Sequence, residues 1–217
     1  MKDIGKFITG FERFQAKYFG EEQGLFSQLR QNQKPRTLVI ACCDSRVDPA
    51  MMTGADPGEL FVIRNVANLV PPYRHEAQAP GIRAAIEFAT KSLEVEHIIV
   101  LGHSSCGGIH ALMDCEGSTH THYEFVGSWV SIAQRAREQV LRELPHKSPA
   151  VQARACEQAA ILVSLDNLLS FPWIQERVNQ GSLFLHGWYF DIDAGELLAY
   201  NAQTSMFSAL NSDGLVE

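Results

Sequence analysis

Residues 37–46 have the sequence Thr37-Leu38-Val39-Ile40-Ala41-Cys42-Cys43-Asp44-Ser45-Arg46. The first six form a nearly continuous apolar run rich in β-branched side chains, which is typical of a parallel strand covered on both faces. Two more runs of this kind follow at 60–63 and 97–102. A helical pattern over 80–93 precedes the third run, and this alternation predicts βαβ units.

The rest of the chain adds helices and a hairpin to this predicted sheet. Apolar residues spaced by three and four predict helices over 3–19, 123–144 and 150–170. Two strand patterns, at 182–191 and 197–200, flank a turn and predict a hairpin. We therefore expect an α/β fold, with a central, mostly parallel β-sheet flanked by helices and a C-terminal hairpin or edge strand.

We expect a single domain over residues 1–217, because no linker or repeat interrupts the chain. Within it, residues 1–35 are predicted to form an N-terminal helical arm, and residues 36–217 to form the α/β core. The first helix of the arm carries an aromatic stripe that includes Phe7, Phe11 and Phe14.

The composition excludes several classes of protein. Of the 217 residues, 18 are Lys or Arg and 25 are Asp or Glu, so the net charge of −7 argues against nucleic acid or an anionic membrane as the partner. Five cysteines are an odd number spread over a long chain, which favours reduced thiols or metal binding over disulfides. No apolar run approaches the ~18 residues of a transmembrane helix. We expect a soluble cytoplasmic protein, with import of a longer precursor left open.

Two clusters of reactive residues directly follow two of the predicted strands. Cys42 begins the first cluster, and His103 and Cys106 belong to the second. Functional side chains gather at the carboxyl ends of parallel strands, so neighbouring strands bring these segments together. Two thiolates and one imidazole suit zinc, and three protein ligands leave a fourth position open, as in catalytic sites. These residues therefore predict a zinc centre.

Asp44 and Arg46 alternate with Cys42 along the chain, so an extended segment places all three on one side. Asp44 could be a fourth ligand that closes the site, or it could accept a hydrogen bond from zinc-bound water. Arg46 can pair with Asp44 through its planar fork. Zinc lowers the pKa of bound water from ~15.7 toward ~7, so the open arrangement would generate hydroxide and direct it.

The other cysteines have simpler interpretations. Strand alternation points Cys43 away from the zinc ligand and toward the core, and Cys156 lies on an Ala-rich helical face that also belongs to the core. Cys115, His120 and His122 lie in a segment rich in Gly, Ser and Thr, which favours a loop over a second metal site.

At these residues the sequence resembles the β-class carbonic anhydrases. Segments 42–46 and 103–108 resemble the paired zinc motifs of that family. The resemblance continues, in order along the chain, through 58–68, 84–89, 167–172 and 187–191. It covers nearly the whole chain.

The resemblance implies reversible hydration of carbon dioxide to bicarbonate and a proton by zinc-bound hydroxide. It implies that Cys42, His103 and Cys106 hold Zn²⁺ and that Asp44 and Arg46 form the catalytic dyad. It also implies a homodimer or a larger homo-oligomer, in which the N-terminal arm lies over the neighbouring subunit.

Val39 stands where one bacterial subtype of the family has Trp, so the chain resembles the plant-like subtype. The family's substrate-binding positions correspond here to Gln33, Phe61, Val66, Phe88 and Gly107. The position of Phe88 is often Tyr in the family, so this chain lacks that hydroxyl.

Two other functions stay open. A hydrolase acting on carbonyl sulfide or carbon disulfide would carry the same motifs on the same scaffold. A non-catalytic zinc protein would keep Asp44 permanently on the metal, although Arg46 can hold it away. The sequence does not choose a proton shuttle among His75, His110, His120 and His122.

Overall fold

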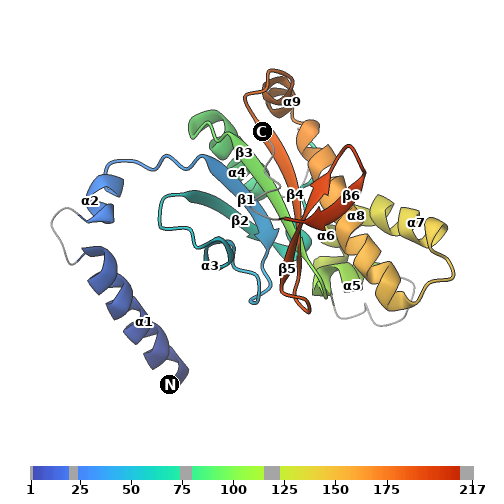
Figure 1. Ribbon diagram of the computed structural model, residues 1–217, viewed down its shortest axis with the longest axis horizontal. Coiled ribbons are helices and arrows are strands. Elements are labelled where there is room, and N and C mark those ends of the chain that lie inside the picture. Colours follow the sequence, from blue (N-terminus) through green and yellow to red (C-terminus); the bar gives the residue numbers. More distant parts are fainter. Residues whose placement is uncertain (1, 20–23, 74–79, 115–122, 211–217) are drawn as a thin grey trace. The chain divides into compact units, whose positions relative to one another are not determined.

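The structure is a computed structural model that describes residues 2–19, 24–73, 80–114 and 123–210 (Figure 1). Its internal contacts divide the chain into two compact units, residues 1–34 and 35–217. Whether the two units form one domain, with an arm over 1–35 and a core over 36–217, stays a prediction.

The N-terminal unit consists of two helices, α1 (Lys2–Phe19) and α2 (Leu25–Leu29). Aromatic rings join them: the ring of Phe26 lies 5.6 Å from that of Phe14 and 4.6 Å from that of Phe19, centroid to centroid. Among the described side chains of α1, five large apolar ones are exposed, namely Ile4, Phe7, Ile8, Phe11 and Phe19. The predicted stripe is therefore only partly covered within this unit, and its contact with a neighbouring subunit stays a prediction.

The second unit is built on a six-stranded sheet with the order β2-β1-β3-β4-β5-β6 (Figure 1). The first four strands of this order run parallel, and β5 and β6 are antiparallel to their neighbours. The strands are β1 (Thr37–Cys42), β2 (Leu60–Asn65), β3 (His97–His103), β4 (Phe184–Asp191), β5 (Glu196–Asn201) and β6 (Met206–Ala209). The expected mostly parallel α/β fold with a C-terminal hairpin is confirmed, and β6 is an addition that the sequence did not predict.

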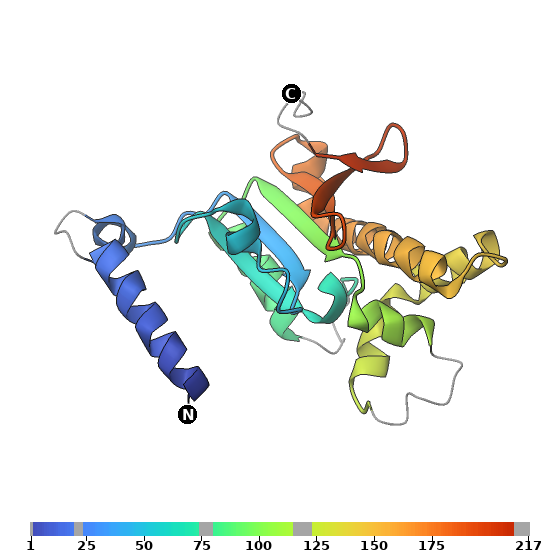
Figure 2. The same cartoon turned by 60° about the horizontal axis from the view of Figure 1, so that its bottom comes forward.

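Helices flank this sheet. They are α3 (Pro49–Thr53), α4 (Pro80–Glu87), α5 (Gly107–Met113), α6 (Val126–Val130), α7 (Gln134–Glu143), α8 (Pro149–Leu169) and α9 (Pro172–Asn179). The long helix α8 passes behind β5 and β6 in Figure 1, and Figure 2 shows its length. It approaches β3 and β4 closely because Gly102 and Gly187 have no side chains: a Cβ there would lie 2.7 Å and 3.0 Å from Ile161.

Across the described ranges, none of the helices combines the length and the apolar character needed to span a membrane. The cytoplasmic location stays a prediction.

One predicted helix is wrong as a single element. Residues 123–144 form α6 and α7, joined by a 3₁₀ turn over Ser131–Ala133. The Oγ of Ser128 donates a hydrogen bond to the Phe125 carbonyl at 2.9 Å, and the Oγ of Ser131 donates to the Ser128 carbonyl at 2.7 Å. Side-chain bonds of this kind to nearby carbonyls compete with the regular helical ladder.

Two expectations about burial are also corrected. β2 is an edge strand rather than one covered on both faces, and its Val62 is 39% exposed. Cys43 is exposed rather than in the core, because β1 ends at Cys42 and the alternation of the strand ends with it. Cys156 is buried, as predicted.

Candidate metal centre

Cys42, His103 and Cys106 come from two neighbouring strand ends. β1 and β3 are parallel partners, and Cys42 and His103 are their last residues. A short turn then leads to Cys106, immediately before α5. In this turn Ser105 has a φ of 57°, a left-handed conformation that is uncommon outside glycine. The turn returns the chain so that Cys106 lies beside Cys42.

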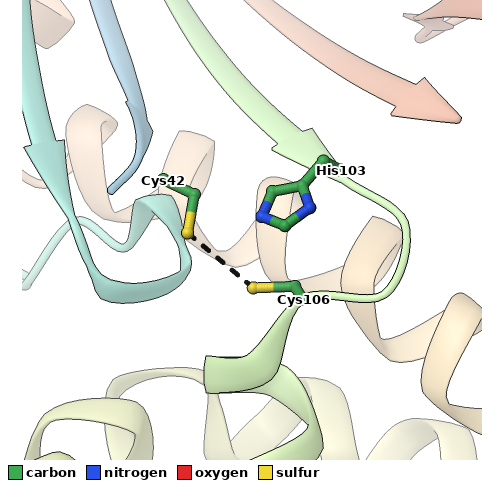
Figure 3. A group of neighbouring side chains, drawn as sticks. All are labelled: Cys42, His103 and Cys106. Carbon is green, nitrogen blue, oxygen red and sulfur yellow. Dashed lines mark hydrogen bonds between the residues drawn. The ribbon is translucent and has the colours of Figure 1, made fainter. Parts of the chain in front are cut away.

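Figure 3 shows the three side chains converging on one point. Their ligand atoms all lie within 4.8 Å of one another, and the sulfurs of Cys42 and Cys106 are 4.0 Å apart. All three residues are buried. This spacing of two sulfurs and one nitrogen is compact enough for all three to bind a single ion.

The imidazole of His103 is oriented for metal binding. Its Nδ1 lies 2.8 Å from the carbonyl oxygen of Ser104, and because a carbonyl only accepts, Nδ1 carries the hydrogen. Its Nε2 is then left with a lone pair, and this buried atom has no hydrogen-bond partner among the residues that the structure describes. A buried acceptor without a partner is unfavourable, and coordination to a metal removes that cost. The residues present therefore fit a zinc ion.

The two thiols affect each other's protonation. A hydrogen bond between their sulfurs lowers the pKa of Cys42 and raises that of Cys106. The metal-free pair therefore holds one proton near neutral pH. A metal bound by both sulfurs has to displace this proton, because the thiolate is the metal ligand.

Arg46 holds Asp44 in a forked ion pair. Oδ1 of Asp44 accepts from the backbone N–H of Arg46 at 3.0 Å and from its Nε at 2.9 Å, and Oδ2 accepts from Nη2 at 2.8 Å. These bonds, the one from the Arg46 side chain above all, hold the pKa of Asp44 well below its usual range. Among the described residues, Asp44 is not part of the group of converging ligand atoms.

Arg64 also supports the segment 42–48, a role that the sequence did not predict. From β2 it donates to the carbonyl oxygens of Cys42 at 3.0 Å and Asp44 at 2.6 Å, and its Nη1 pairs with Asp48 at 3.0 Å. It fixes the backbone that carries both a candidate ligand and the dyad. A lone Arg at the end of an edge strand gives no local signal of this role, because all of its partners lie at least 16 residues away.

The structure brings some predicted substrate-binding residues to the centre. Val66 directly follows β2, whose last residue pairs with Cys42. A Cβ on Gly108 would lie 2.6 Å from the side chain of Val66, so Val66 packs against the start of α5, next to Gly107.

Other predicted substrate-binding residues lie elsewhere. Phe61 pairs with Leu38 in the sheet, four residues before the pairing with Cys42, which is about 13 Å along the strand. Phe88 packs on Phe61, with ring centroids 6.0 Å apart, and is 45% exposed. Gln33 belongs to the N-terminal unit, and its role stays a prediction.

Among the candidate proton shuttles, His110 lies on the exposed surface of α5. His75, His120 and His122 lie outside the described residues, as does Cys115.

The fold and this centre define an α/β protein with a candidate metal site at the carboxyl edge of its parallel strands. The sequence profile of a family described as carbonic anhydrase matches residues 37–197. Beta carbonic anhydrase 5, chloroplastic, of Arabidopsis thaliana is 45% identical over 166 residues, which make up 76% of this chain and 54% of that protein.

Solved structures agree with these sequence matches. The β-carbonic anhydrase CcaA is similar with a TM-score of 0.90 and 38% identity, over 98% of this chain and 94% of that one. A chain from the crystal structures of two tetrameric β-carbonic anhydrases of Sordaria macrospora gives a TM-score of 0.78 and 26% identity, over 93% of this chain and 96% of that one. The chain therefore belongs to the carbonic anhydrase family, in its β class, and carbon dioxide hydration is the general activity of that family.

Proposed function

We propose that this chain catalyses the reversible hydration of carbon dioxide to bicarbonate and a proton, with zinc held by Cys42, His103 and Cys106. The observation that carries the proposal is the buried, unpartnered Nε2 of His103 beside two buried thiols (Figure 3). A bound zinc ion lowers the pKa of a coordinated water and supplies a nucleophile near neutral pH.

Asp44 and Arg46 supply orientation. The lowered pKa of Asp44 keeps its carboxylate ionised at neutral pH, so it is available there as a hydrogen-bond acceptor. Arg46 holds both oxygens of that carboxylate with its guanidinium group. This favours an open metal position over the non-catalytic alternative in which Asp44 is a permanent ligand. Asp44 is therefore proposed to orient the nucleophile toward carbon dioxide.

We also propose that the substrate slot is completed by a second copy of the chain. Val66 and Gly107 lie at the centre, whereas Phe61 and Phe88 form an aromatic pair farther along the sheet and are partly exposed. Carbon dioxide is apolar and favours an apolar slot. In a homo-oligomer this pair can face the centre of a neighbouring subunit, and the tetrameric relatives support such an assembly.

The test is stopped-flow hydration of carbon dioxide with bound zinc quantified in the same sample. The unmodified protein should bind about one zinc per chain and hydrate carbon dioxide. Asp44→Asn should keep the zinc and lose about 100-fold or more in turnover. Asp166→Asn is a matched control, because Asp166 forms an exposed ion pair with Arg135. Hydrolysis of carbonyl sulfide without hydration of carbon dioxide would contradict the proposal.

A further inference from the structure

Glu157 is a buried carboxyl group behind the candidate metal centre. It lies on α8, is 4% exposed, and neither the motifs nor the dyad includes it. Its Oε1 accepts the backbone N–H of Cys106 at 3.0 Å, and its Oε2 accepts the hydroxyl of Tyr189 at 2.7 Å. Both carboxyl oxygens are therefore held by hydrogen bonds. A buried carboxyl group is unfavourable unless hydrogen bonds hold it.

The bond from Glu157 is one of two that hold the same peptide unit. The N–H of the Ser105–Cys106 peptide points to Glu157, and its carbonyl oxygen, on Ser105, accepts from Nη2 of Arg46 at 3.1 Å. Arg46 in turn holds Asp44. A continuous chain of hydrogen bonds therefore runs from the buried carboxyl group through one peptide to the dyad.

That peptide is also the strained part of the turn. Ser105 has its φ of 57° immediately before Cys106, and a non-glycine residue stays in this conformation only when its surroundings fix it. Two side chains, Glu157 at one edge of the peptide and Arg46 at the other, provide that fixation. Bonds in such a chain polarise one another, so losing one weakens the other.

We propose that Glu157 is a positioning residue: it fixes the Ser105–Cys106 peptide so that the Cys106 sulfur meets the metal and Arg46 remains bound to Asp44. This inference rests on the proposed zinc centre. Residues that orient metal ligands from outside the coordination sphere commonly change metal affinity when they are replaced.

Tyr189 secures the far side of Glu157. It is fully buried on β4, where it pairs with Gly102 of β3. Burial, together with the hydrogen bond to Glu157, raises the pKa of Tyr189, so its hydroxyl remains a donor across the physiological range. Replacing Tyr189 with Phe removes this one bond and leaves the bond between Glu157 and Cys106 in place.

The test measures metal binding in Glu157→Met, which keeps the length of the side chain and removes both acceptor oxygens, including the one that accepts the Cys106 N–H. We expect zinc affinity, measured by competition with a chelator, to fall about 10- to 100-fold. We also expect the thiolate-to-metal absorption band of the cobalt(II)-loaded protein to shift. Tyr189→Phe should weaken zinc affinity by a smaller factor in the same direction.

Ser164→Ala is the matched control. Ser164 is a fully buried polar residue of the same helix. Its hydroxyl is hydrogen-bonded to the backbone of Val70 and Asn68 rather than to the Ser105–Cys106 peptide. This variant should lose thermal stability but keep the zinc affinity and the cobalt spectrum of the unmodified protein.

Unchanged zinc affinity and an unchanged cobalt spectrum in folded Glu157→Met would overturn the inference, as would equal losses in Ser164→Ala. If Glu157→Met does not fold, Glu157→Asp draws the carboxyl group back from the Cys106 N–H by one methylene, and an unchanged zinc affinity and cobalt spectrum in that variant would overturn it. Failure of the unmodified protein to bind zinc would instead contradict the proposed function, so the two failures are distinguishable.

Discussion

The metal centre and the aromatic pair of Phe61 and Phe88 differ in how complete they are within one chain. At the candidate centre, three buried side chains with possible ligand atoms converge, and the backbone around them is bonded to Arg46, Arg64 and Glu157. The aromatic pair lies on the edge strand and on the π-helical segment Phe88–Ser92 that follows α4, where Phe88 remains 45% exposed.

One chain can form the candidate metal centre by itself, whereas the surface around Phe61 and Phe88 would be completed only in an assembly. The carboxyl ends of β1 and β3 meet wherever the sheet forms, so the centre needs no partner. The exposed ring of Phe88, beside the partly buried Phe61 of the edge strand, leaves apolar surface uncovered, which is unfavourable unless another surface covers it. We therefore predict that a single chain can bind the metal and that substrate binding requires two chains.

The largest effect is expected at the centre itself. Cys106→Ser removes one of two thiolates and should lose zinc and activity together, by more than about 10³-fold in turnover, because free water has a pKa of ~15.7 rather than ~7. Zinc content and stopped-flow hydration measure both losses. Cys156→Ser is the control, because that buried thiol lies outside the converging group. An active Cys106→Ser protein without metal would contradict the account.

The candidate metal centre could be predicted well from the sequence. The apolar runs located the strands, and the rule that parallel strands end at one edge brought Cys42 and His103 together. It did not predict Glu157 or Arg64 as supports, because their bonds go to backbone atoms far away in the sequence. Local spacing carries no information about such contacts.

The position of the aromatic pair, Phe61 and Phe88, was less predictable from the sequence. The resemblance placed Phe61 and Phe88 in a substrate pocket, but the register of β2 places Phe61 opposite Leu38 and away from Cys42. Strand patterns reveal alternation, and they do not reveal which strand is an edge or which chain covers it. For the same reason, the exposure of Val62 did not follow from its apolar run.

A complementation experiment tests whether sites are shared between chains. The double variant Phe61→Ala, Phe88→Ala should lose about 100-fold in turnover while keeping its zinc, because the slot loses two aromatic side chains. Co-assembled with Cys106→Ser, it should recover to about a quarter of the unmodified activity. Half of randomly paired dimers contain both variants, and each of these has one intact site of two. Recovery no greater than the average of the two variants measured alone would contradict sharing.

The pH dependence of zinc binding tests the centre alone. The raised pKa of Cys106 means that its thiol is protonated in the metal-free protein, and zinc must displace that proton. Affinity should therefore rise with pH through the neutral range and fall as the medium becomes more acidic. Chelator competition at several pH values measures the slope, and a flat profile would contradict a thiolate ligand at this position.

The smallest expected effect concerns the exposed stripe of α1. Phe7→Ser together with Phe11→Ser should weaken self-association several-fold, because both side chains are left uncovered by the N-terminal unit and would be covered in an assembly. Sedimentation over a range of concentrations measures it. Lys6→Ser is the control on the same helix, since it removes a polar side chain. An unchanged association constant in the Phe variant would place the assembly surface elsewhere.

The central claim is that zinc is held by two thiolates and one imidazole at the carboxyl edge of β1 and β3. X-ray absorption at the zinc edge of the purified, zinc-loaded protein tests it most directly. We predict that the zinc ion has two sulfur neighbours at about 2.3 Å and nitrogen or oxygen neighbours at about 2.0–2.2 Å. A zinc shell without sulfur, or one made of four sulfurs, would contradict it.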